Sequence, residues 1–103
     1  MDFDRLKQLV FKHYYQKGFF QEMNEHGRFG DITELALINT EVAEAIEEIR
    51  QKEINKDHLT EECADIVIRV MNFCNRHNID LQKAIINKND INEKREFRHG
   101  KAI

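Results

Sequence analysis

The chain has 103 residues, about the usual size of one domain, so it can bury one modest core but not two. It contains no Pro, no Trp and four Gly, and 34% of its residues are charged, which favours long amphipathic helices over a turn-rich sheet. A formal net charge of −3 argues against general binding to nucleic acid or to a membrane surface. We therefore expect a single all-α domain over residues 1–103.

Location and cysteine chemistry follow from the same inspection. No window approaches the roughly 18 apolar residues of a membrane span, and the start MDFDRLKQLV lacks a basic segment followed by an apolar run. We expect a cytoplasmic protein. Cys63 and Cys74 fall on one predicted helix, about 16 Å apart along its axis, which is too far for a disulfide. Both are expected to be reduced, buried thiols.

Apolar residues at helical spacing predict the first two helices. The first runs from Asp2 or Asp4 to Lys17, before a glycine that supplies a stop. Residues 19–31 have no sustained period and predict a loop with a short turn. The second helix is expected to begin at Asp31, which stands three residues before a glutamate as in a capping box, and to end near residue 52.

The remaining helices complete a bundle. The third spans residues 59–76 and is expected to end at Asn78, and Asp80 can cap a fourth helix that becomes strongly polar toward the C-terminus. The fold class is therefore an antiparallel bundle of about four helices. Because helices of this size with long apolar stripes leave much surface to cover, we expect oligomerisation to complete the bundle.

Two pairs of carboxylates lie beside the apolar stripes. At 100° per residue, Glu41 and Glu44 fall on one shoulder of the second helix, and Glu62 and Asp65 fall at the same offset on the third. If these two helices pack antiparallel, the four acids converge. Such a cluster is costly unless a cation sits in it, and oxygen ligands suit Mg²⁺ first and Mn²⁺ second. Mg²⁺ often bridges to phosphates, which favours a phosphate ester or anhydride as substrate. The alternative is a pair of solvated helix shoulders in a glutamate-rich chain.

The spacing of these acids carries a resemblance to a known family. Glu41-x-x-Glu44, seventeen residues, and Glu62-x-x-Asp65 resemble the E-x-x-E, spacer, E-x-x-D pattern of the MazG-like nucleotide pyrophosphohydrolases, which are all-α. The flanking sequences ALINTEVAEAIEEIR and EECADIVIRVMNFCNRHNIDLQKAI are also similar to that family. The resemblance covers about residues 31 to 101.

The C-terminal part extends the resemblance. Many MazG-like proteins close with a K…N..R…HGK pattern, which this chain matches through Lys88, Asn92, Arg95 and residues 98–101. One departure is Glu96-Phe97, where the family often has Pro-Tyr. Before residue 31 the match is loose and rests on Gly18-Phe19-Phe20.

The resemblance implies hydrolysis of a nucleoside triphosphate between its α- and β-phosphates, giving the monophosphate and pyrophosphate. Glu41, Glu44, Glu62 and Asp65 would hold Mg²⁺, and Glu41 or Glu44 would act as general base. Lys88, Asn92 and Arg95, helped by Lys101 and His99, would grip the phosphates; the alternative for them is a solvated polar helix end. Nucleotide-pool cleaning is an implied role.

The residues that would recognise the base are less clearly indicated by the sequence than those that would bind metal and phosphate. Phe19 and Phe20, with Phe29 and Tyr14, offer rings that stack on a nucleobase, although aromatics near helix ends are more often part of a core. His13 and His26 have no spacing typical of metal ligands.

Several alternatives stay open at this level. A dUTPase-like or phosphoribosyl-ATP pyrophosphohydrolase-like specificity belongs to the same superfamily. A different class of function is a noncatalytic helical interaction module that binds metal or nucleotide without turnover. Relatives form homodimers or homotetramers in which a neighbouring chain often completes the active site, so Lys88, Asn92 and Arg95 would serve the metal site of another subunit.

Overall fold

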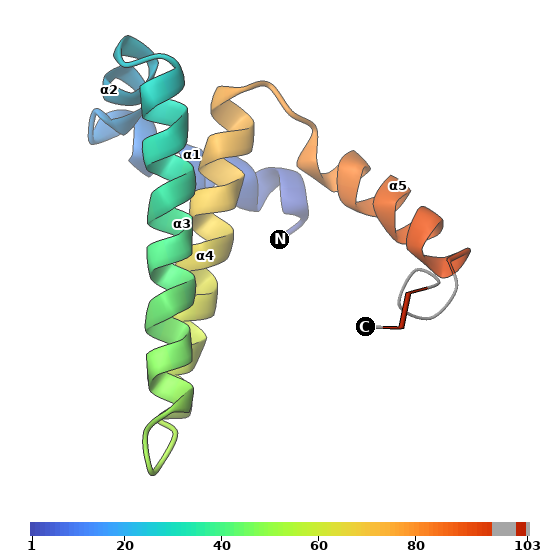
Figure 1. The fold of residues 1–103 in the computed structure, drawn as a ribbon. Helices are drawn as coiled ribbons and strands as arrows, with labels where there is room; N and C mark the ends of the chain where they lie inside the picture. The colour runs from blue at the N-terminus through green and yellow to red at the C-terminus, as the bar shows by residue number, and fades with distance from the viewer. Residues whose placement is uncertain (96–100, 103) are drawn as a thin grey trace.

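The computed structural model describes residues 1–95 and 101–102, and all regular structure in these ranges is helical. The helices are α1 (Phe3–Gln16), α2 (Phe19–Glu25), α3 (Arg28–Ile49), α4 (Lys56–Arg76) and α5 (Leu81–Glu93). α3 and α4 form a long antiparallel pair, α1 crosses one end of this pair, and α5 projects away from it (Figure 1). None of these five helices is long and apolar enough to cross a membrane. The all-α prediction is confirmed.

The described chain has one helix more than expected, because part of the predicted loop is helical. Residues 19–25 form α2, whose seven residues are too few to produce a clear apolar period. α3 also begins earlier than predicted, at Arg28, and its N-cap is Gly27 with φ 55. The prediction that Asp31 caps this helix was therefore wrong. It lies in the first turn of α3 and contacts α4 instead.

Close packing against α3 holds the short helix α2 in place. Gly30 is buried at the crossing of α2 and α3, and a Cβ atom there would clash with the backbone carbonyl of Met23. Met23 is itself 8% exposed. The glycine thus permits the contact that fixes α2 against α3, a tertiary effect with no local sequence period.

The ends of the later helices follow the sequence prediction. Asp80 accepts a hydrogen bond from the Lys83 backbone N–H at 3.2 Å and caps α5. Asn78 adopts a left-handed conformation with φ 57, and the Ile79 N–H donates to the Cys74 carbonyl at 2.8 Å. This is the Schellman arrangement that ends α4.

A buried ion network joins four helices. The Arg76 side chain on α4 is 3% exposed and donates from Nε to Glu34 Oε1 on α3 at 2.8 Å, and it also binds Asp31. It reaches Asn24 of α2 at 3.2 Å. On the other side, the Tyr14 hydroxyl of α1 donates to Glu34 Oε2 at 2.7 Å. Because each charge has a partner, the network fixes α1, α2 and α4 around the start of α3.

The core is small and much apolar surface remains open. Only Tyr14, Met23, Met71 and Cys74 are classed as buried apolar side chains among the described residues. Cys63, predicted to be buried, is exposed, and Val67, one turn further along α4, is 54% exposed. The prediction for Cys63 was wrong for the single chain, because no residue that the structure describes covers that side of α4. Both cysteines are free thiols, as expected.

Candidate active site

The α3–α4 pair brings the predicted carboxylates together. Glu41 of α3 and Glu62 and Asp65 of α4 each place a carboxylate oxygen so that the three atoms lie within 4.8 Å of one another. Glu62 and Asp65 share a face because they are three residues apart on one helix. Three of the four acids that were expected to converge therefore lie together across the helix pair.

Glu44 adjoins this cluster through Glu62. The pKa of Glu62 is raised to about 7, first because burial penalises its charged form and then because the carboxylates of Glu44 and Glu41 face it. One oxygen, Glu62 Oε2, is buried and has no hydrogen-bond partner among the described residues. The site therefore concentrates negative charge and leaves a buried acceptor unsatisfied, as expected of carboxylates arranged around a cation.

Arg69 supplies a counter-charge that sequence reasoning missed. Its Nε donates to Glu41 Oε1 at 3.0 Å, and its side chain is 40% exposed while that of Glu41 is 13% exposed. The signal available in the sequence was its place one turn after Asp65, on the same side of the predicted helix. Arg69 is thus the basic residue that the structure places at the acidic cluster.

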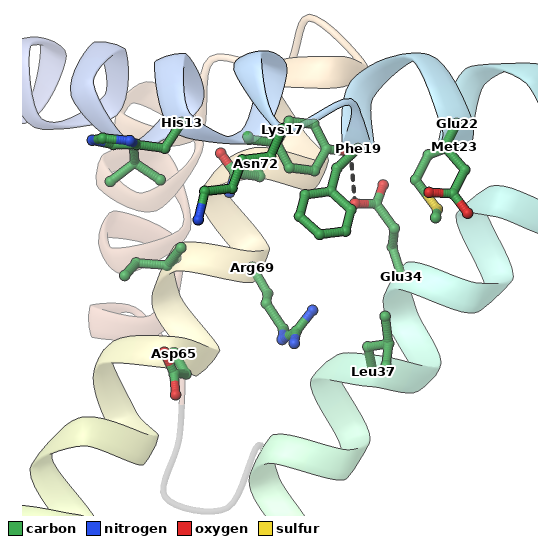
Figure 2. Close-up of a pocket in the computed structure, with 13 residues that line it drawn as sticks. His13, Lys17, Phe19, Glu22, Met23, Glu34, Leu37, Asp65, Arg69 and Asn72 are labelled. Atoms are coloured by element: carbon green, nitrogen blue, oxygen red, sulfur yellow. Dashed lines mark hydrogen bonds between the residues drawn. The ribbon is translucent and has the colours of Figure 1, made fainter.

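A cavity of about 450 Å³ opens beside the cluster, and it is lined by Asp65 of the cluster and by Arg69, the partner of Glu41 (Figure 2). Its volume lies in the range of small-molecule sites. Its apolar wall includes Val10, Met23, Leu37 and Ile68, whereas polar residues such as His13, Lys17 and Glu22 also line it. The arrangement joins a carboxylate cluster at one end to a largely apolar chamber at the other.

The two phenylalanines predicted for base binding separate in the structure. Phe19 lines the cavity and stacks against Tyr14, with ring centroids 6.1 Å apart and an interplanar angle of 23°. Phe20 does not line this cavity. It contacts Phe11 and Tyr15 at centroid distances of 5.6 and 5.3 Å. Only Phe19 is placed to meet a ligand in the chamber.

Two other glutamates of α3, Glu34 and Glu48, make contacts away from the carboxylate cluster. Glu34 lines the cavity but is engaged by Tyr14 and Arg76. Glu48 accepts a hydrogen bond from the Asn55 backbone N–H at 2.7 Å and so holds the connection between α3 and α4. Neither belongs to the carboxylate cluster.

The predicted phosphate-binding residues lie elsewhere in the single chain. Lys88 and Asn92 are on α5 and Arg95 follows it, and α5 projects away from the α3–α4 pair (Figure 1). The structure does not bring them to the carboxylate cluster of the same chain. Lys101 is exposed, and His99 with its neighbours 96–98 and 100 lies outside the described residues.

Comparison with known families identifies the family of the chain. The sequence model of the MazG nucleotide pyrophosphohydrolase domain matches residues 29–103, which include all four carboxylates. The chain therefore belongs to the MazG nucleotide pyrophosphohydrolase family, and the resemblance drawn from the sequence is confirmed. Comparison with curated proteins and with solved structures gives no significant match.

Proposed function

We propose that this protein is a Mg²⁺-dependent pyrophosphohydrolase that cleaves nucleoside triphosphates, ribo or deoxy, between the α- and β-phosphates. The observation that carries the proposal is the convergence of Glu41, Glu62 and Asp65 beside a cavity of about 450 Å³ that Asp65 also lines. Family membership supplies the reaction class. The products would be a nucleoside monophosphate and pyrophosphate, and nucleotide-pool cleaning is the cellular role that such an activity would serve.

The donor set fits a hard divalent cation. Glu41, Glu44, Glu62 and Asp65 offer only oxygen, which Mg²⁺ prefers and Mn²⁺ accepts, and the unpaired Glu62 Oε2 is an acceptor that a cation would satisfy. When bound here, the metal would neutralise phosphate oxygens and lower the pKa of the attacking water.

The surroundings of Glu41 and Glu44 distinguish the two candidates for general base. Glu41 is held by Arg69 through a hydrogen bond of 3.0 Å, whereas Glu44 stands next to the three-residue cluster, is exposed and has no such partner among the described residues. Of the two candidates for general base, Glu44 is therefore the better placed. It would take the proton of the water that attacks the α-phosphorus, where a new P–O bond forms while the bond to the bridging oxygen breaks and pyrophosphate leaves.

The phosphate grip from α5 would come from another subunit. Ile85, Ile86 and Ile91 on α5 are between 49% and 54% exposed, and Ile32 and Ile46 on α3 are 62% and 54% exposed. Exposed apolar surface on this scale favours burial against a second copy. In a homodimer or homotetramer, the Lys88, Asn92, Arg95 and Lys101 side chains would serve the carboxylate cluster of a neighbouring chain.

Product analysis tests the proposal directly. Purified protein with Mg²⁺ is incubated with ribo- and deoxynucleoside triphosphates, including dUTP, and with phosphoribosyl-ATP, and monophosphate plus pyrophosphate is resolved from diphosphate plus phosphate. We expect the first pair of products, lost in Glu41→Gln and kept in Glu61→Gln, a control on the exposed side of α4. No turnover of any substrate by a folded oligomer would contradict the proposal and favour a noncatalytic binding module.

A further inference from the structure

Asn72 is a buried polar side chain of the cavity that the proposed reaction does not use. It lies on α4, lines the cavity and is 7% exposed, and its Oδ1 is buried with no hydrogen-bond partner among the described residues. A buried amide left unpaired is unfavourable, so such groups are normally satisfied by protein, water or ligand. Within residues 1–95 and 101–102, no group supplies a partner to that oxygen.

The other polar residues of the cavity are either engaged or near solvent. Glu34 is bound by Tyr14 and Arg76, and His13, Lys17 and Glu22 are exposed. Asn72 is therefore the buried group that remains available for a specific hydrogen bond inside the chamber.

The distance between Asn72 and the carboxylate cluster is comparable with the length of a nucleotide. Asp65, Arg69 and Asn72 are spaced i, i+4 and i+7, so they follow one face of α4 from the cluster into the cavity (Figure 2). Asp65 and Asn72 are about 10 Å apart along the helix axis. A nucleotide with its phosphates at Asp65 and Arg69 would thus extend its base toward Asn72. Phe19, 48% exposed at the cavity wall, offers a ring face for that base.

We propose that Asn72 determines base preference by hydrogen bonding to the edge of the nucleobase in this cavity. This inference rests on the proposed nucleotide substrate and names the residue that would discriminate among bases. An amide presents one acceptor and one donor group side by side, which matches a base edge carrying a donor next to an acceptor. Rotation of the amide exchanges its two ends, so the partner base decides which end faces it.

Several residues of this wall come from α1 and α2, which precede residue 29, where the family match begins. The family reaction is therefore carried by the matched part of the chain, whereas the chamber around Asn72 combines α4 with helices outside that match. This arrangement separates the cleavage machinery from the surface that would select the base.

Binding of nucleoside monophosphates without metal tests the inference independently of hydrolysis. Dissociation constants of AMP, CMP, GMP and UMP are measured by calorimetry in EDTA for the unmodified protein, Asn72→Leu, Asn72→Asp and the control Asn75→Leu, which lies on α4 outside the cavity. For the unmodified protein and the control, we expect the dissociation constants of the weakest and the tightest monophosphate to differ by about tenfold or more. Asn72→Leu should reduce this range to about threefold or less.

Asn72→Asp gives the directional result. A carboxylate only accepts hydrogen bonds, so it favours guanine, whose edge carries two neighbouring donors, over adenine and cytosine. GMP should rise in rank in this variant. Melting temperatures complete the test, because Asn72→Leu removes an unpaired polar group and should leave the melting temperature unchanged or raised.

An unchanged base ranking in both Asn72 variants would overturn the inference, as would the absence of any ranking in the unmodified protein. If base ranking depends on Asn72 but no triphosphate is hydrolysed, the proposed reaction fails and the inference stands. If triphosphates are hydrolysed with a ranking that Asn72 does not affect, the inference alone fails.

Discussion

Glu41 of α3 and Arg69 of α4 are joined by a hydrogen bond of 3.0 Å at the point where the acidic cluster meets the cavity. In the absence of a cation this bond offsets part of the repulsion among the carboxylates. A metal entering the cluster would compete with the guanidinium for Glu41, and Arg69 would then be available to a phosphate, which it can bind through two parallel hydrogen bonds.

Replacement of Arg69 by alanine should therefore tighten metal binding and weaken substrate binding. Without its competitor, Glu41 is free to coordinate, and we expect the dissociation constant for Mg²⁺ or Mn²⁺ to fall by about fivefold. The KM for the triphosphate should rise by about tenfold or more, because a phosphate contact is lost. Calorimetry and steady-state kinetics check the two effects. Arg50→Ala, which breaks an exposed pair with Glu47, is the control. Weaker metal binding in Arg69→Ala would contradict the competition.

Replacement of Glu44 by glutamine should raise stability and lower activity. The amide removes one charge from a crowded acidic site, so the melting temperature in EDTA should rise by roughly 4 °C. If Glu44 is the general base, turnover should fall by about 100-fold or more. Glu47→Gln, on the exposed side of the same helix, should show neither effect. A Glu44→Gln protein that is less stable and fully active would refute both the repulsion among the carboxylates and the role of Glu44 as general base.

The raised pKa of Glu62 predicts a pH-dependent stability of the metal-free protein. Its ordinary pKa is 4.5 and its folded value is about 7, so between these values the folded state binds more protons than the unfolded state. Stability from this group is present below pH 4.5 and is lost as the pH rises through 7. In EDTA, the melting temperature of Glu62→Gln should therefore fall less than that of the unmodified protein between pH 5 and pH 8.

Metal binding should be linked to the same proton. Because the cation binds the ionised carboxylate, its association below pH 7 should release a proton from Glu62, and its affinity should fall as the pH falls. Calorimetry in two buffers of different ionisation enthalpy measures that proton. Equal proton release by the unmodified protein and Glu62→Gln would show that another group titrates.

The buried network around Arg76 should control the stability of the whole helical assembly. Removing the guanidinium in Arg76→Ala leaves Glu34 buried with only Tyr14 as a partner, and the free energy of unfolding should fall by about 3 kcal/mol or more. Denaturant unfolding measures this loss. Arg5→Ala, on the exposed side of α1, should change stability by less than about 0.5 kcal/mol. Equal losses in the two variants would contradict the role of the network.

Subunit complementation tests whether α5 serves a neighbouring chain. Glu41→Gln and Lys88→Ala are each expected to be inactive, because one lacks the cluster and the other a phosphate contact. Refolded together as a dimer, they should regain roughly a quarter of the activity, since half of the assemblies are hybrids with one intact site of two. Glu41→Gln mixed with Glu62→Gln should regain none. No recovery in the first mixture would show that Lys88 does not act in trans.

The sequence by itself determined the helical class, the caps at Asp80 and Asn78, and the convergence of the two carboxylate pairs. These features depend on local chemistry: side-chain oxygens near helix ends, a left-handed residue after α4, and the fixed angle between residues three or four apart on a helix. Antiparallel packing of α3 on α4 was enough to bring Glu41, Glu62 and Asp65 together.

Only the tertiary structure decided which polar residues meet across helices distant in the chain. Among the glutamates of α3, Glu34 pairs with Arg76 and Glu41 pairs with Arg69. The seven residues of α2 form a helix because Gly30 lets α3 approach them closely, and this contact has no period in the sequence. The cavity in front of Asn72 likewise depends on four helices packing together, and pairwise periodicity does not encode the space left between them.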